Sequence, residues 1–372
     1  MSSFPTSKAP GDHAVACDSG SVTCILQSPE AQRHWARDGI YGLGESWMNG
    51  EWTVDHLDDF LCQIMSGPTP KISWLSWVRL LGAAAKTRFV DQQAGKGAFR
   101  IGEAHYDLGN ELFELMLDSS MSYTCGYWKD ATDLEEAQRH KLDVLCRKLE
   151  LEPGMQVLDV GCGWGNFAHH AATHYGVEVT GLTVSAEQAE YAKNRCAALP
   201  VNILLQDYRT FDGHFDRIVS IEMIEAVGRR NLPRWYRDID RWLRPGGCFA
   251  LQAIVGETIS RTSDRRLDQY ILWLVRHIFP DGCLPRVQEL SARGTSMRID
   301  SWERISGDYD RTLLAWYERF EQGWNTISDR YSERFRRCWQ FYLLGCAAAF
   351  RSGLVDVNQI VYRKSSSQGV RP

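Results

Sequence analysis

The chain of 372 residues is long enough for two domains, or for one large domain with an extension. Its formal net charge of −5 gives no general reason to bind nucleic acid or anionic membranes, and no apolar run approaches the roughly 18 residues of a membrane span. The 11 cysteines form no C-x-x-C pair and the N-terminus has no apolar leader. We therefore expect a cytoplasmic protein with reduced thiols and no metal site.

The N-terminal part of the chain reads as a flexible terminus, residues 1–27, followed by a small helical domain, residues 28–100. Ser28 and Pro29 are a typical helix cap and first turn, and apolar side chains recur at helical spacing from residue 55 to 65. Basic residues gather at the end of this domain, where they either contact phospholipid headgroups or form a solvated linker. They are Lys86, Arg88, Lys96 and Arg100, and they follow Trp74 and Trp77.

Residues 101–372 read as one catalytic domain in which strands and helices alternate after a first helix that begins at Asp133. This alternation predicts an α/β fold with a parallel, doubly wound, Rossmann-like sheet and helices on both faces. We expect strands at 156–160, 177–182, 201–206, 215–221, 248–254, 296–300 and, as an edge strand, 359–362. We expect helices at 166–175, 185–198, 231–243, 264–277 and, interrupted near Gly323, 309–350.

The turn after the first strand of this core carries the sequence Asp159-Val-Gly-Cys-Gly-Trp-Gly165. Glycines let a bound molecule approach the backbone, and the N–H groups that open the next helix attract negatively polarised groups. A dinucleotide site needs G-x-G-x-x-G with a later acidic residue, and a phosphate loop needs Gly-Lys-Ser/Thr, so neither pattern fits. The string instead resembles the S-adenosylmethionine loop of Rossmann-like methyltransferases. The alternative is a tight turn without a ligand.

Polar residues also follow the other strands of the predicted sheet. Ligands of such sheets bind outside the carboxyl ends of the strands, so these residues should share one rim with the glycine loop. They are Thr183 to Ser185, Asp207, Tyr208, Glu222 to Glu225 and Gln252. A rim so rich in polar groups is the expected place of an active site.

Several long motifs together resemble the bacterial cyclopropane-fatty-acyl-phospholipid synthases, within the mycolic acid cyclopropane synthase-like methyltransferase family. They are His105–Asn110, Tyr123–Cys125, Asp159–Gly165, Ile278–Leu284, Asp308–Phe320 and Tyr331–Phe335, and Gly42–Ser46 extends the match into the helical domain. The resemblance implies transfer of the methyl group of S-adenosylmethionine to a cis double bond in a phospholipid acyl chain. Loss of a proton from the new methyl group then closes a cyclopropane ring. It also implies a homodimer that contacts the inner face of the cell membrane peripherally.

The resemblance further implies that a bicarbonate ion, held by a small polar cluster, serves as the base. The matching positions are the side chains of Cys125, Glu225 and Tyr309 and the backbone at Ile254. Gln252 stands where the family has a histidine, and Ala226 replaces a second one. Because glutamine can donate a hydrogen bond but cannot carry a proton, an imidazole base is excluded at Gln252.

For the cofactor, the resemblance implies a second set of residues. The methionine end and ribose are expected near Tyr123, Thr124, Gly161, Gly163, Thr183 and Gln188, and the adenine near Asp207 and Tyr208. Asp207 can accept from the adenine amino group and Tyr208 can stack on the ring.

Three points stay open at the level of the sequence. Because the two histidines are missing, the chain could instead be a related enzyme that methylates an unsaturated lipid or another small molecule without ring closure. A non-catalytic lipid-binding module is the alternative outside the enzymes. A stripe of arginines between Arg229 and Arg244, with Trp235 and Trp242, is either a solvated helix face paired with Asp238 and Asp240 or a headgroup contact.

Overall fold

The computed structural model describes residues 24–68, 109–256, 264–280 and 282–366, together with Val78 and Gly82. The chain divides into two compact units. The first comprises Met1–Val90, Glu257–Pro280 and Leu313–Val355, and the second comprises Asp91–Gly256, Asp281–Thr312 and Asp356–Pro372. This division differs from the predicted consecutive segments 28–100 and 101–372, because two later segments pack with the N-terminal helices. Most of segment 1–27, the basic cluster that ends at Arg100 and the motif at His105 lie outside the described residues.

The first unit is a group of helices with a short two-stranded sheet. It contains β1 (Cys24–Leu26), α1 (Pro29–Met48), β2 (Trp52–Val54), α2 (Leu57–Ser66), α10 (Arg265–His277), η4 (Trp324–Thr326) and α12 (Glu333–Arg351). Ser28 caps α1 as predicted, since its hydroxyl accepts from the N–H of Glu30 at 3.0 Å. α10 packs on α1, so the helix predicted at 264–277 belongs to this unit and not to the sheet. None of the helices in the described residues is long and apolar enough to cross a membrane.

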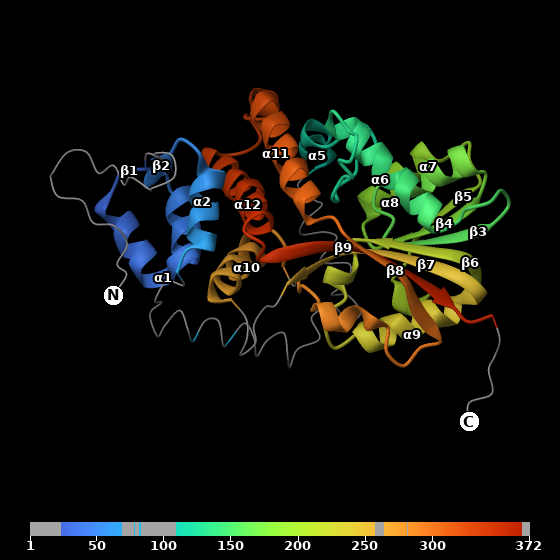
Figure 1. Ribbon diagram of the computed structural model, residues 1–372. Coiled ribbons are helices and arrows are strands. Elements are labelled where there is room, and N and C mark those ends of the chain that lie inside the picture. Colours follow the sequence, from blue (N-terminus) through green and yellow to red (C-terminus); the bar gives the residue numbers. More distant parts are fainter. Residues whose placement is uncertain are drawn as a thin grey trace. The chain divides into compact units, whose positions relative to one another are not determined.

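The second unit is built on a seven-stranded sheet in the order β5-β4-β3-β6-β7-β9-β8 (Figure 1). The five strands from β5 to β7 are parallel neighbours, and all five were predicted. The strands are β3 (Gln156–Val160), β4 (Glu178–Thr183), β5 (Val201–Leu205), β6 (Phe215–Ile221), β7 (Leu243–Gly256), β8 (Met297–Arg304) and β9 (Val355–Lys364).

The two C-terminal strands pair antiparallel, which makes the sheet mixed rather than wholly parallel. The strand predicted at the edge, residues 359–362, is part of β9 and lies inside the sheet between β7 and β8. β9 is buried from Val357 to Tyr362, whereas β8 exposes Ile299 and Trp302 by 42% and 40%. β8 is therefore the edge, and its charged residues are typical of an edge strand.

Helices cover both faces of this sheet, as predicted (Figure 1). α6 (Leu134–Lys148), α7 (Asn166–Tyr175) and α8 (Ala186–Arg195) lie on one face and α9 (Leu232–Trp242) lies on the other. The side chains of β3 point alternately to the two faces of the sheet, so this strand contributes to the hydrophobic cluster on each face. Val157 packs in one cluster with Phe167 of α7, while Leu158 packs in another with Trp235 of α9. The remaining elements of the unit are α5 (Asn110–Met116), η1 (Tyr208–Thr210), η2 (Ile224–Ala226), η3 (Val287–Ser291) and the first turns of α11 (Ser306–Gly323).

Candidate active site

The glycine loop joins β3 to α7 in a conformation that requires glycine. Gly161, Gly163 and Gly165 have φ angles of +90°, +52° and +79°, which lie in the region that favours glycine. The N–H groups of Gly161 and Cys162 both donate to the carbonyl of Leu182 on β4, at 3.0 and 2.9 Å. A Cβ atom placed on Gly163 would meet nothing within 4 Å. The loop is therefore held against β4 and leaves open space at Gly163.

A cavity lies beside this loop and brings together most of the residues predicted to bind the cofactor. Its lining includes Tyr123, Thr124, Asp159, Gly161, Gly163, Gln188 and Ile221. Gln188 is oriented by Thr183, whose hydroxyl donates to Oε1 of Gln188 at 3.0 Å. Thr183 thus acts behind the cavity wall, since it is not part of the lining.

Asp159 gives this cavity an unsatisfied acceptor. Its side chain is buried, and within the described residues its Oδ2 atom has no hydrogen-bond partner. Burial raises the pKa of Asp159 to about 7. An ammonium or hydroxyl group of a ligand would satisfy this oxygen, because buried polar groups are normally hydrogen-bonded. The open space at Gly163 and the unpaired oxygen of Asp159 together fit the methionine end of S-adenosylmethionine.

The two residues predicted to contact the adenine lie at the end of β5 but do not line this cavity. Both oxygens of Asp207 bind the guanidinium of Arg209, the shorter distance being 2.5 Å to Oδ2. Tyr208 packs in a hydrophobic cluster and is 9% exposed. Their roles toward adenine therefore stay predictions, and the carboxylate of Asp207 would have to share its oxygens with Arg209.

A second cluster centres on Glu222, the residue that directly follows β6. Its carboxylate accepts three hydrogen bonds: from the N–H of Cys125 at 3.0 Å, from Nε2 of Gln252 at 2.8 Å and from the hydroxyl of Tyr309 at 2.7 Å. The donors come from the loop before α6, from β7 and from the first turn of α11. The structure thus unites three predicted site residues around a fourth, which the sequence placed on the rim without a role.

Glu225 and Ile254 form a pair beside this cluster. The N–H of Ile254 donates to Oε1 of Glu225 at 2.6 Å, while Oε2 is buried and has no hydrogen-bond partner among the described residues. Burial, and then the charge of Glu222, raise the pKa of Glu225 to about 8. Glu225 is therefore the carboxyl group that burial and the neighbouring Glu222 favour in its protonated form.

A buried lysine that the sequence analysis missed lies close to this charge. Nζ of Lys141 donates to the hydroxyl of Thr124 and to Oε1 of Gln138, both at 2.7 Å. Burial lowers the pKa of Lys141 to about 8, while the charges of Asp118 and Glu222 act in the opposite direction. The apolar spacing around residue 141 is typical of an ordinary core helix. The only sign in the sequence of a buried cation near Glu222 is therefore a lysine at a position that should face the core.

Gln252 is fixed by a chain of hydrogen bonds on its far side. Its Oε1 atom accepts from Nε2 of Gln359 at 2.8 Å, and Oε1 of Gln359 accepts from Nζ of Lys148 at 2.6 Å. Because the oxygen of the Gln252 amide is held by Gln359, its NH₂ group faces Glu222. The side chain is fully buried, so this orientation cannot be exchanged for contacts with water.

The residues expected to hold bicarbonate are close together, but their donors are already paired. Glu222 accepts from Cys125, Gln252 and Tyr309, and Glu225 accepts from the backbone of Ile254. The thiol of Cys125 donates to the carbonyl of Gly126 at 3.3 Å, and burial raises its pKa well above the usual range. A bicarbonate ion does not fit this arrangement, because Glu222 already takes the hydrogen bonds of Cys125, Gln252 and Tyr309.

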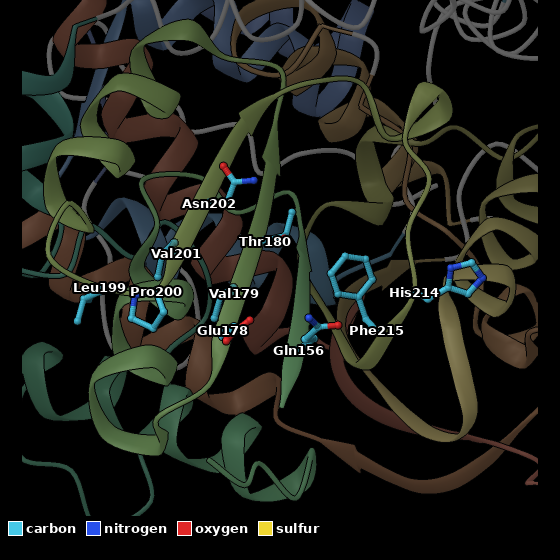
Figure 2. A pocket seen from close by; sticks show the side chains of 10 residues that line it. All are labelled: Gln156, Glu178, Val179, Thr180, Leu199, Pro200, Val201, Asn202, His214 and Phe215. Carbon is cyan, nitrogen blue, oxygen red and sulfur yellow. The ribbon is translucent and has the colours of Figure 1, made fainter. Parts of the chain in front are cut away.

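A larger hollow lies at the opposite ends of the strands from the candidate site, where the parallel strands begin. Figure 2 shows its lining at the amino ends of four neighbouring strands, including Gln156 of β3, Glu178 of β4, Val201 of β5 and Phe215 of β6. Its volume is about 530 Å³, yet it contains none of the predicted site residues. The predicted residues gather instead at the carboxyl ends, where parallel sheets bind their ligands.

Comparison with known proteins decides the family. The model of the mycolic acid cyclopropane synthetase family matches residues 93–360, which include the glycine loop and the Glu222 cluster. The chain belongs to the mycolic acid cyclopropane synthetase family. As a family member it is an S-adenosylmethionine-dependent methyltransferase that acts on unsaturated lipids.

Relatives of this cyclopropane synthetase family member span nearly its whole length. It is 43% identical over 350 residues to the cyclopropane-fatty-acyl-phospholipid synthase of Escherichia coli (strain K12), covering 93% of this chain and 89% of that one. It is 34% identical over 368 residues to the tuberculostearic acid methyltransferase UfaA1 of Mycobacterium tuberculosis, covering 94% and 85%. The crystal structure of mycolic acid cyclopropane synthase CmaA1 complexed with SAH and CTAB matches with a TM-score of 0.67 and 33% identity, covering 72% and 98%.

Proposed function

We propose that this protein forms cyclopropane rings in the unsaturated acyl chains of membrane phospholipids. The observation that supports this most directly is the connection between the cofactor cavity and the carboxylate cluster. Tyr123 and Thr124 line the cavity, and the next residue, Cys125, donates to Glu222. Ile221 also lines the cavity and directly precedes Glu222. A methyl group held in the cavity would therefore lie beside the half-buried carboxyl group of Glu222.

The residues of the chain suit the chemistry of such a transfer. S-adenosylmethionine, when bound, supplies an electrophilic methyl group. Asp159 and Gln188 would hold its methionine end, and Gly163 would leave room for it. The charge of Glu222 would stabilise the positive charge that develops on the lipid, and the buried side chains of Cys125, Gln252 and Tyr309 around it would exclude water.

Ring closure also requires a base for the proton of the new methyl group. The family resemblance implies bicarbonate in this role. That ion would need the donors now held by Glu222 and Glu225, so the proposal requires a base but does not require bicarbonate.

Methylation without ring closure is the second candidate function. Two observations favour it: Gln252 cannot carry the proton that a histidine could, and a relative at 34% identity is a tuberculostearic acid methyltransferase. The two candidates share the cofactor, the unsaturated lipid and the need for a base, and they differ in which proton is lost.

Peripheral contact with the inner face of the membrane and a homodimer are further parts of the proposal. Contact with a bilayer follows from the phospholipid substrate. The arginine stripe on and beside α9 gives it little support, because Arg234 and Arg241 pair with Asp238, Arg244 pairs with Asp216, and Trp235 and Trp242 are fully buried. Sedimentation with vesicles of neutral and anionic phospholipids would test the membrane contact, and light scattering would test the dimer.

The decisive experiment is mass spectrometry of lipids after incubation with S-adenosylmethionine and vesicles of a monounsaturated phospholipid. The expected product carries one additional CH₂ unit and lacks the alkene signal in its NMR spectrum. A product with the additional CH₂ and a retained alkene would establish the second candidate function. Absence of any lipid product, with active cofactor binding, would contradict both.

A further inference from the structure

We propose that the carboxylate of Glu222 is the base that removes the proton from the new methyl group, in place of a bound anion. The inference rests on the proposed function, since it names the base of that reaction. It concerns a residue that the sequence analysis placed on the rim without a role.

The first argument is the donor set around Glu222. Three donors bind its two oxygens: the backbone N–H of Cys125, the amide of Gln252 and the hydroxyl of Tyr309. All three residues are among those expected to surround bicarbonate, although the side chain of Cys125 was the group expected there. A carboxylate and a bicarbonate ion both present two oxygens on a planar carbon. Glu222 therefore places a covalently attached equivalent of the ion at the position that the ion would take.

The second argument is the backbone at Glu222. Its φ angle is +51°, in the region that favours glycine, and it is held there by a hydrogen bond of 2.8 Å from its N–H to the carbonyl of Gln252. Residues with side chains adopt this conformation only when the surroundings compensate the strain, and such residues cluster at active sites. Here the compensation is visible as the three hydrogen bonds to the side chain.

The third argument is the charge of the site. The titratable groups that face Glu222 are Lys141, Glu225, Tyr309 and Cys125. Burial raises the pKa of Glu222, while its hydrogen bonds and the charge of Lys141 favour the ionised form. Glu225 accepts from the backbone N–H of Ile254, and burial and the charge of Glu222 raise its pKa to about 8. Glu222 thus has a stronger affinity for a proton than an exposed carboxylate, while its hydrogen bonds and Lys141 stabilise its charged form.

The step balances without a further reactant. The π electrons of the alkene form a bond to the methyl carbon as the bond from that carbon to sulfur breaks, which leaves a positive charge on the second alkene carbon. A C–H bond of the new methyl group then breaks and its proton moves to an oxygen of Glu222. The electron pair of that bond joins the methyl carbon to the cationic carbon and closes the ring. Glu222 returns the proton to water after the product leaves.

Gln252 fits the same assignment. A protonated histidine at this position would form an ion pair with Glu222 and weaken it as a base. The neutral amide of Gln252 donates to Glu222 at 2.8 Å and to the carbonyl of Cys125 at 3.3 Å, and it leaves the carboxylate charge in place. A neutral glutamine at position 252, where the family has a histidine, therefore suits a carboxylate base at position 222.

The test compares the wild type with Glu222→Gly and Glu222→Gln in buffer depleted of bicarbonate and in buffer with bicarbonate added. Glycine adopts the φ angle of residue 222 without strain and vacates the space of the carboxylate. We expect the wild type to be insensitive to bicarbonate and Glu222→Gly to lose at least about 100-fold in turnover when bicarbonate is absent. Added bicarbonate should raise the turnover of this variant at least about tenfold, because the donors of Cys125, Gln252 and Tyr309 are still present to bind the ion.

Glu222→Gln keeps the size of the side chain and should lose turnover without rescue by bicarbonate. Binding of S-adenosylhomocysteine by calorimetry should be unchanged in both variants, which shows that they are folded. Glu178→Gln, at the opposite edge of the sheet (Figure 2), is the matched control and should behave as the wild type.

Two results would overturn the assignment of Glu222: a wild type whose product formation depends on bicarbonate, or full turnover of Glu222→Gly in depleted buffer. A methylated alkene from the wild type would contradict ring closure but leave this comparison intact, because that product also requires a base. A wild type that makes no lipid product would overturn the proposed function, and the inference with it.

Discussion

The hydroxyl of Tyr309 donates a hydrogen bond of 2.7 Å to Oε2 of Glu222, across 87 residues of sequence. It is the contact through which the start of α11 meets the carboxyl end of β6. Because the phenol is neutral and buried, it favours the ionised carboxylate without cancelling its charge. The cluster is therefore tuned by neutral donors, and the single cation close to it in the described residues, Lys141, bonds to Thr124 and Gln138 rather than to Glu222.

Tyr309→Phe removes one of the three donors while leaving the ring in place. A hydrogen bond to a charged group contributes about 1.5–3 kcal/mol, so we expect turnover to fall about 10–100-fold with little change in the affinity for S-adenosylhomocysteine. Loss of the donor raises the pKa of Glu222, so the acid limb of the pH profile should move to higher pH. Tyr127→Phe, which loses a bond to Glu303, is the control. A pH profile that moves equally in both variants would contradict the role of Tyr309.

Asp159→Asn should stabilise the ligand-free protein at high pH. Burial raises the pKa of Asp159 to about 7, so the folded state holds a proton that the unfolded state releases above about pH 4. Asp159 therefore lowers the free energy of unfolding as the pH rises from about 4 to 7. We expect the free energy of unfolding of Asp159→Asn, measured by urea unfolding, to exceed that of the wild type by about 1–3 kcal/mol at pH 8. At pH 4 the two free energies should be equal.

The same substitution should weaken the binding of S-adenosylmethionine at pH 8 by at least about tenfold, because the lost carboxylate is the unpaired acceptor of the cavity. Asp216→Asn provides a control of opposite sign. The N–H of Gln156 and the guanidinium of Arg244 hold the pKa of Asp216 low against the effect of burial, so that variant should be less stable than the wild type at pH 8. If Asp159→Asn binds S-adenosylmethionine as tightly as the wild type does, Asp159 does not contact the cofactor.

Gln359→Glu tests the chain of hydrogen bonds behind Gln252. Glutamate can still accept from Lys148, but it cannot donate to Oε1 of Gln252. We expect turnover to fall about 3–10-fold at an unchanged KM for S-adenosylmethionine, since the Gln252 amide loses the contact that orients it. Thermal unfolding measured alongside would show whether the fold persists. A change in KM alone would indicate that Gln359 acts on the cofactor cavity instead.

Gly163→Ala tests the open space in the glycine loop. The new methyl group would enter the cavity at a residue with a φ angle of +52°. Gly154→Ala is a matched control, because Gly154 has a φ angle of +82° and equally empty surroundings, but lies in the turn before β3. Both variants should lose about 1 kcal/mol of stability, and only Gly163→Ala should bind S-adenosylhomocysteine more weakly. Equal affinities in the two variants would show that the cavity at Gly163 is not the binding site.

Local patterns predicted the elements of the sheet well, because glycine turns and apolar runs act over short distances. The glycine loop, the helix caps and every core strand from Gln156 to Gly256 appear where the sequence indicated. The carboxyl-end rule likewise brought Gln252 and Glu222 to one rim. It could not show which of the rim carboxylates the donors would bind, because Cys125 and Tyr309 approach Glu222 from distant parts of the chain.

The predictions that failed involve partners far apart in sequence. β9 was expected at an edge because a final short strand usually adds there, yet β8 pairs outside it. α10 was counted with the sheet because its amphipathic pattern does not reveal which surface it covers, and it packs on α1.

The interior position of β9 also bears on how the protein is synthesised. β9 is the last strand of the sheet in chain order, yet β8, made before it, has no sheet neighbour other than β9 among the described residues. Gln359, which orients Gln252, is itself part of β9. A chain still on the ribosome and lacking this strand therefore carries a detached β8 and an unanchored Gln252. The polar cluster around Glu222 can be completed only after β9 has been synthesised, so folding of the catalytic centre must wait for this strand.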